Sequence, residues 1–217
     1  MPFATCIVKL RDVPAMKYTS QDKPFPRGEI CIKGANIFQG YYNAPDKTAE
    51  VLVDGWNLTG DVGTWDAQGR LKIIDRVKNI FKLAQGEYIA PEKVEVVLNK
   101  FELVGQSFVY GDSLQAHIVA VVVPDWETLN PWAQQNGFKH SSLEEVCADP
   151  KVNALMLKLL MAHCKENDLK GFETPRTIHL DAEPFSAENQ LLSPTFKLKR
   201  HEAKNKYLKQ IEQMYKQ

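Results

Sequence analysis

Residues 69–95 read GRLKIIDRVKNIFKLAQGEYIAPEKVE, and this stretch decides the fold. Its opening RLKIID has strand composition, and the DAQG before it at 66–69 is typical of a hairpin turn. NIFKLAQGEYI predicts a second hairpin over 79–89. Pro91 then opens a helix, because proline is favoured at the first helical position. The stretch therefore marks a change from turn-rich strands to strands that alternate with helices.

Downstream, this alternation predicts a small α/β domain. Val94, Val97, Leu98 and Phe101 continue the first helix at helical spacing. SFVYG and HIVAVVV are expected strands, and the second is apolar almost throughout, as in the centre of a sheet. A capping box at Ser141 and Glu144 is expected to start one long helix through Leu160. It is followed by a short strand at 176–180, a loop over 181–196 and a basic helix over 199–216.

Upstream, residues 1–75 are expected to form strands joined by turns, with no helix. FATCIVKL and GEICIKG have strand composition, and prolines and glycines punctuate the connections between them. A few strands without a helix make a poor domain on their own. We therefore expect residues 1–75 to be the end of a larger domain.

Composition indicates a globular protein in a reducing environment. Hydrophobic residues make up 44% of the 217 residues, and Lys+Arg equal Asp+Glu at 27 each, so the overall charge predicts no attraction to nucleic acid. The four cysteines form no CxxC pair, which argues against a disulfide framework or a zinc site. The charge is uneven, however, because seven Lys/Arg stand against two Glu from Thr195 onward. Such a basic tail indicates a local anionic partner.

Several motifs occur in a fixed order: GEICIKG (28–34), GYYNAPDKTAE (40–50), DGWNLTGD (54–61), the 69–95 stretch and PTFKLKR (194–200). TGD alone is a common turn tripeptide. The ordered set, however, resembles the adenylate-forming (AMP-binding) enzymes, and most closely the long-chain fatty acyl-CoA synthetases. GDSLQAHIVAVVVPDWETL and GFETPRTIHLDAEPFSAENQLLSPTFKLKR resemble the same subgroup. The similarity therefore spans essentially the whole chain, and it covers only the C-terminal portion of such an enzyme.

The resemblance implies an α+β fold, in which the end of a distorted β-barrel subdomain precedes a small α/β C-terminal domain. Residues 1–75 would end the large AMP-binding domain, residues 76–79 would form a hinge, and residues 80–217 would form a small mobile domain with a catalytic lysine loop. The implied enzyme is a long-chain fatty acid–CoA ligase. It converts ATP, a long-chain fatty acid and coenzyme A to acyl-CoA, AMP and pyrophosphate through an acyl-adenylate.

The first expected site residues would bind nucleotide near the hinge. Asp61 is a carboxylate on a glycine turn, suited to accept both hydrogen bonds of a ribose diol, and by resemblance it binds the ribose of ATP. Arg76 offers a rigid donor fork for ribose or phosphate oxygens, and Lys78 aligns with the hinge. The alternatives are a turn-capping role for Asp61 and a surface ion pair of Arg76 with Asp75.

The second hairpin would contribute further contacts. Lys82 and Tyr88 match nucleotide-contacting positions in related synthetases, although Tyr88 equally fits a half-buried strand residue. By resemblance the LAQGEY hairpin forms part of the pantetheine channel for coenzyme A. Gly86 fits that use, because a backbone without a side chain can approach a ligand closely.

Lys197 is the expected catalytic residue. Fatty-acid activation brings a carboxylate to the α-phosphate of ATP, so a cation is needed between two negative groups. Lysine suits that task as a compact charge on a long stem, and Lys197 aligns with the family's loop lysine. Lys199 and Arg200 are expected to begin the following helix. The alternative is a solvated basic helix end.

Other parts of the family pattern have no counterpart in these 217 residues: the phosphate loop, the acyl tunnel and the Mg²⁺ ligands. We therefore expect the chain alone to be inactive. For the full-length enzyme the resemblance implies the cytoplasmic face of intracellular membranes, with any membrane association made by an N-terminal region. Two alternatives stay open: another acyl-adenylating ligase, or a non-catalytic module whose basic C-terminal helix binds anionic membrane or nucleic acid.

Overall fold

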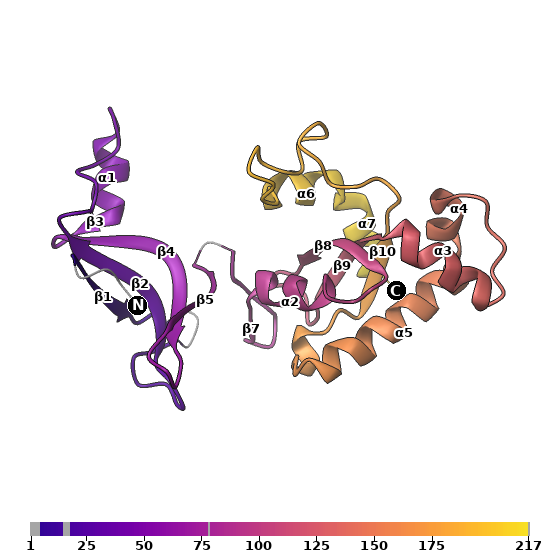
Figure 1. Cartoon of the computed structure of the whole chain (residues 1–217), viewed down its shortest axis with the longest axis horizontal. Coiled ribbons are helices and arrows are strands. Elements are labelled where there is room, and N and C mark those ends of the chain that lie inside the picture. The colour runs from indigo at the N-terminus through magenta and orange to yellow at the C-terminus, as the bar shows by residue number, and fades with distance from the viewer. Residues whose placement is uncertain (1–4, 15–17, 78, 217) are drawn as a thin grey trace. The chain divides into compact units, whose positions relative to one another are not determined.

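The computed structural model describes residues 5–14, 18–77 and 79–216 (Figure 1). The chain forms two compact units, Met1–Ile80 and Phe81–Gln217. The five-stranded sheet belongs to the first unit, and the three-stranded sheet and the β6–β7 pair belong to the second.

The first unit is a curled antiparallel sheet. Its strand order is β1-β2-β4-β3, and β5 pairs with another part of the long strand β4. Register shifts interrupt β4 against β2 and against β5, and such bulges bend a strand and increase its twist. Figure 1 shows the resulting curve of β4. The strands are β1 (Cys6–Arg11), β2 (Arg27–Gly34), β3 (Leu52–Val53), β4 (Trp56–Trp65) and β5 (Leu71–Arg76).

The first unit also contains a helix, α1 (Pro45–Val51), so the expectation of strands without a helix was wrong. Pro45 lies in the first turn, where its missing N–H costs no hydrogen bond. No residue of α1 is buried, which explains why hydrophobic spacing gave no signal for it. The predicted hairpin turn is confirmed, because the Gly69 N–H donates to the Asp66 carbonyl between β4 and β5.

The second unit is built on a three-stranded sheet with the order β10-β9-β8. Strand β9 (Val119–Pro124) lies in the centre and is buried along its whole length, as its apolar sequence predicted. It runs parallel to β10 (Thr177–Leu180) and antiparallel to β8 (Val104–Tyr110). With the curled sheet of the first unit, this mixed sheet and its helices confirm the predicted α+β fold class.

Helices cover both faces of this sheet (Figure 1). One core joins alternate β9 residues such as Ala120 and Val122 to α2, α3, α4 and α5. The other core joins Val119, Val121 and Val123 to α6 and α7. The helices are α2 (Pro91–Leu98), α3 (Trp126–Gln135), α4 (Leu143–Ala148), α5 (Pro150–Glu166), α6 (Arg200–Lys206) and α7 (Leu208–Met214), with a 3₁₀ turn at Gly171–Glu173.

Two predicted helices differ in detail. The expected long helix is divided into α4 and α5, because Asp149 has an extended backbone and Pro150 begins a new helix. Its cap is Ser142, one residue later than predicted, whose side chain accepts from the Glu145 N–H. The basic segment is divided into α6 and α7 at Tyr207. Helical hydrogen bonds still continue through this residue, because the Tyr207 N–H donates to the Ala203 carbonyl and the Ile211 N–H donates to the Tyr207 carbonyl.

The first predicted helix is shorter than expected, since α2 ends at Leu98 and Phe101 lies beyond it. The predicted second hairpin is confirmed: β6 (Phe81–Lys82) pairs antiparallel with β7 (Tyr88–Ile89). Within the described ranges, no helix has the length and apolar character needed to cross a membrane. The described cysteines are not joined by disulfides.

Acid sensitivity of the second unit should depend on His179 in β10. Burial lowers the pKa of His179, against a smaller opposing effect of Asp181. As the pH falls below about 6.5, the unfolded chain therefore binds the proton before the folded chain does, and the free energy of unfolding falls. We expect His179→Gln to flatten this loss between pH 7.5 and 5.5, measured by hydrogen exchange of the β9 amides. The control is His201→Gln, since the His201 side chain in α6 is exposed. Equal slopes in both variants would contradict the prediction.

Candidate functional site

Asp61 and Arg76 lie opposite each other in the first unit. They are paired residues of β4 and β5, and Arg76 Nε donates to Asp61 Oδ1 at 3.0 Å. The Asp61 side chain is 26% exposed and that of Arg76 is 53% exposed, so both can reach a ligand. The structure thus brings together two residues that the sequence marked separately. The alternative pair of Arg76 with Asp75 stays untested, because the Asp75 side chain is outside the described set.

Asp61 lies inside strand β4, at an irregularity opposite β2, so the expectation of a glycine turn here was wrong. The local backbone and Glu29 fix this part of the strand. Gly60 has a φ of +73°, which favours glycine, and its N–H donates to Glu29 Oε1 at 3.1 Å. Thr59 Oγ1 accepts from the Asp61 N–H and donates to the Ile30 carbonyl. Sequence reasoning missed Glu29, which is only 4% exposed and also binds Arg11. The only available signal was an acidic residue inside a strand pattern.

The hairpin of β6 and β7 carries the next predicted residues. Lys82 and Tyr88 are paired across it, and Lys82 Nζ lies 5.5 Å from the centre of the Tyr88 ring. Tyr88 is half-buried, consistent with the structural alternative. Gly86 has a φ of +91° and donates to the Leu83 carbonyl at 2.9 Å, so glycine is explained here by the turn itself.

Lys197 lies at an exposed tight turn of the second unit. The Ser193 N–H donates to the Lys197 carbonyl at 2.8 Å, and the Lys197 N–H donates to Ser193 Oγ at 3.1 Å. Phe196 precedes the lysine with a φ of +57° and is 80% exposed. A bulky residue in the left-handed region is strained and needs such a closed turn to hold it. Leu192 and Leu198 form a bridge below the turn.

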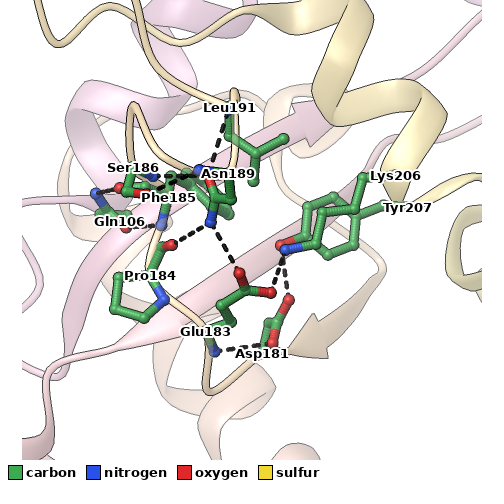
Figure 2. A network of polar contacts seen from close by, with 10 residues as sticks. All are labelled: Gln106, Asp181, Glu183, Pro184, Phe185, Ser186, Asn189, Leu191, Lys206 and Tyr207. Carbon is green, nitrogen blue, oxygen red and sulfur yellow. Dashed lines mark hydrogen bonds and ion pairs between the residues drawn. The ribbon is translucent and has the colours of Figure 1, made fainter.

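The segment that leads to this turn is held by a network of polar contacts (Figure 2). Gln106 of β8 donates to the Phe185 carbonyl at 3.0 Å and accepts from the Phe185 N–H at 2.6 Å. Tyr207 donates to Asp181, and Lys206 donates to Glu183, both at 2.6 Å. Asn189 joins Glu183 to the neighbouring backbone. The loop predicted over 181–196 is therefore irregular in backbone but firmly attached to the sheet and to α6–α7.

The predicted site residues fall on both units. Asp61 and Arg76 belong to the first, whereas Lys82, Gly86, Tyr88 and Lys197 belong to the second. Lys78 lies outside the described residues. Among the residues that the structure does describe, no group of three His, Cys, Asp or Glu side chains could hold a metal ion.

A hollow of about 400 Å³ lies elsewhere in the second unit, between α5, β10 and α7. Cys147, Asn153, His179 and Gln210 are among its lining residues, and none of the predicted site residues lines it. Burial raises the pKa of the Cys147 thiol to about 12, so this cysteine stays protonated and is a poor nucleophile.

Comparison with known proteins identifies relatives for the whole chain. It is 52% identical over 217 residues to the peroxisomal long chain acyl-CoA synthetase 6 of Arabidopsis thaliana, covering 100% of this chain and 31% of that protein. It is 49% identical over 215 residues to human long-chain-fatty-acid–CoA ligase 1, covering 99% of this chain and 30% of that protein. The chain thus spans about a third of the length of these relatives. No family model matches it.

Among solved structures, a similar one is the adenylation domain of the carboxylic acid reductase from Segniliparus rugosus, in complex with AMP and a co-purified carboxylic acid. The TM-score is 0.85 with 36% identity, covering 98% of this chain and 32% of that one. The corresponding domain from Mycobacterium chelonae gives a TM-score of 0.84 with 37% identity, covering 98% of this chain and 31% of that one. The similar segments are C-terminal parts of adenylate-forming enzymes, as the sequence resemblance implied.

Stability of the loop segment should depend strongly on Gln106. Gln106→Ala leaves the N–H and carbonyl of Phe185 without their partner. Because Phe185 is buried, water does not readily replace the lost hydrogen bonds. An unsatisfied buried polar group costs about 1–3 kcal/mol, so we expect a loss of this size. Hydrogen exchange of the β9 amides measures it, with the exposed Gln134→Ala in α3 as control. A loss no larger than the control's would show that water replaces Gln106 at no cost.

Proposed function

We propose that this chain, which belongs by sequence to the long-chain acyl-CoA synthetases, forms the ribose-contacting strand and the lysine-bearing part of a long-chain fatty acid–CoA ligase. The main support is the 52% identity, over all 217 residues of this chain, to long chain acyl-CoA synthetase 6 of Arabidopsis thaliana. The reaction has two steps. A fatty acid carboxylate attacks the α-phosphorus of ATP and releases pyrophosphate, and the thiol of coenzyme A then displaces AMP from the acyl-adenylate.

Asp61 would accept the hydroxyl hydrogens of the ATP ribose. Its carboxylate is oriented by the 3.0 Å hydrogen bond from Arg76 Nε and by the irregular strand backbone at Gly60. Arg76 has further guanidinium donors beyond Nε, which suit ribose or phosphate oxygens. The described residues offer no metal cluster, so we assign no step to the Mg²⁺ that accompanies ATP.

Lys197 would act in the first step only. Carboxylate and α-phosphate repel each other, and a cation placed between them stabilises the charge that develops in the transition state. The exposed turn supports this role, since a closed backbone holds the base of a long, mobile side chain. Lys82, Tyr88 and Gly86 would contact nucleotide and the pantetheine arm of coenzyme A.

Other functions are less well supported. A different acyl-adenylating ligase would share Asp61, Arg76 and Lys197, but identity to the carboxylic acid reductase domain is 36%, against 52% for the long-chain synthetase. A module that binds anionic partners through α6 and α7 would need unpaired cations there. Two of the four Lys and Arg residues of these helices are instead engaged within the chain, since Arg200 pairs with Glu95 and Lys206 pairs with Glu183. For the full-length enzyme we place the site at the cytoplasmic face of an intracellular membrane; one relative is named peroxisomal.

Lys197→Ala, made in a full-length ligase that carries this segment, should abolish adenylate formation and spare thioester formation from supplied acyl-adenylate. Loss of one preorganised electrostatic donor costs roughly 10²–10³ in rate. Fatty-acid-dependent pyrophosphate exchange measures the first step, and coenzyme A consumption from synthetic acyl-adenylate measures the second. Lys199→Ala is the control because it removes the same charge two residues away. If both variants behaved alike in both assays, Lys197 would be surface charge.

Residues 76–79 would form a hinge about which the two units move between the two steps. Support comes from the division of the chain between Ile80 and Phe81. In the same full-length ligase, Lys78→Pro should slow one half-reaction much more than the other, since proline fixes the φ angle that a hinge must change. The same two assays measure the effect. Equal loss in both steps would count against a hinge.

A further inference from the structure

Glu95 binds Arg200, the residue that begins α6 just after the exposed turn of residues 193–197, which we call the lysine turn. Its side chain is on α2, yet it accepts two hydrogen bonds from the guanidinium of Arg200, 105 residues later: Oε1 accepts from Nη1 at 3.0 Å, and Oε2 accepts from Nη2. Both side chains are largely buried, at 10% and 19% exposure. A bidentate contact of this kind fixes the orientation of the two side chains as well as their distance.

Glu95 also ties this contact to the sheet. Its Oε1 accepts from the Val109 N–H of β8, the edge strand, at 2.8 Å. Helix α2 packs in the core on one face of the sheet, whereas α6 packs in the core on the other. The carboxylate therefore joins both helical layers around the edge of β8. Burial raises the pKa of Glu95, and the Arg200 charge with the Val109 N–H opposes that shift.

Arg200 begins α6 only three residues after Lys197, a distance of roughly 10 Å along an extended chain. Between them the Lys199 N–H donates to the Leu191 carbonyl at 2.8 Å, and Leu198 pairs with Leu192. The network of Figure 2 holds the entry to the loop through Gln106, Asp181 and Glu183. The Glu95–Arg200 pair is the matching contact at the exit.

We propose that Glu95 is a positioning residue for Lys197: it acts through Arg200 to hold the lysine turn in the geometry that the first half-reaction needs. This inference rests on the proposed function of Lys197. It predicts more than a stability role, because a misplacement of about 1 Å at a reacting group costs on the order of 10²-fold in rate. A pair that only stabilised the fold would affect both half-reactions alike.

Glu173 provides a matched control. Its side chain is as buried as that of Glu95, at 7% against 10% exposure, and it also pairs with a cation, Lys93 of the same helix α2. Its contact lies away from the lysine turn, in the 3₁₀ turn before β10. Glu173→Gln therefore removes a comparably buried carboxylate without touching Arg200, although its cation Lys93 is more exposed, at 46%.

The first test uses the 217-residue chain and needs no activity. Glu95→Gln should speed hydrogen exchange at the Ser193 and Lys199 amides about tenfold more than at the β9 amides, because the turn opens locally. Glu173→Gln should speed all of these amides alike, and Arg200→Lys, which keeps the charge but loses the fork, should resemble Glu95→Gln in weaker form. If Glu95→Gln speeds the turn and β9 equally, Glu95 stabilises the fold only and the proposal is overturned.

The second test uses the full-length ligase. Glu95→Gln should lower kcat for pyrophosphate exchange about 10²-fold with little change in KM for ATP, and should leave thioester formation from acyl-adenylate within about threefold. Glu173→Gln should not separate the two steps. A loosened turn with unchanged pyrophosphate exchange would overturn the positioning role. Failure of the proposed function is seen separately, as full pyrophosphate exchange in Lys197→Ala.

Discussion

Strand β9 is buried along its whole length, and both cores of the second unit are built on its two faces. Successive side chains of a strand point to opposite faces, so a shift of one residue would exchange the two sets. Ala120 and Val122 would then meet α6 and α7, and Val119 and Val121 would meet α2 and α5. This alternation decides which helices pack on which face of the sheet. The segment that carries Lys197 runs from β10 in the sheet to α6 on one of these faces, so both of its ends are held by that packing.

That segment crosses from β10 to α6 with little regular structure, and polar contacts replace the missing backbone ladder. Three carboxylates make most of these contacts: Asp181 binds Tyr207, Glu183 binds Lys206 and Glu95 binds Arg200. Taking a carboxylate out of water is costly unless it is paired, so the buried Glu95 must keep its partner. The result is a fixed backbone below an exposed lysine, an arrangement suited to delivering a charge to a substrate.

The first unit also holds a candidate residue in place with a buried, paired carboxylate, next to a smaller core. Ile30, Cys31 and Val62 are buried there, and Glu29 is buried beside them with its carboxylate on Arg11 and the Gly60 N–H. The irregular part of β4 that presents Asp61 is thus held by a charged residue from the neighbouring strand β2. In both units, a candidate residue (half-buried Asp61, exposed Lys197) is supported by a buried carboxylate that comes from elsewhere in the sequence.

The sequence by itself determined most of the strands, the two hairpins, the central place of β9 and the similarity to acyl-CoA synthetases; it missed β3 and the middle of β4. These features are local, because period-two apolar patterns, turn residues and motif order can be recognised along the chain. The roles of Asp61, Arg76 and Lys197 came from that similarity and remain proposals. The division of α4 from α5 at Pro150 and the start of α1 at Pro45 had a local signal that the prediction missed, whereas tertiary structure alone decided the partners of Glu29 and Glu95. Those partners lie far away in the chain, 105 residues for Glu95 and Arg200. A charged residue inside a strand or helix pattern does not reveal which distant cation the fold will bring to it.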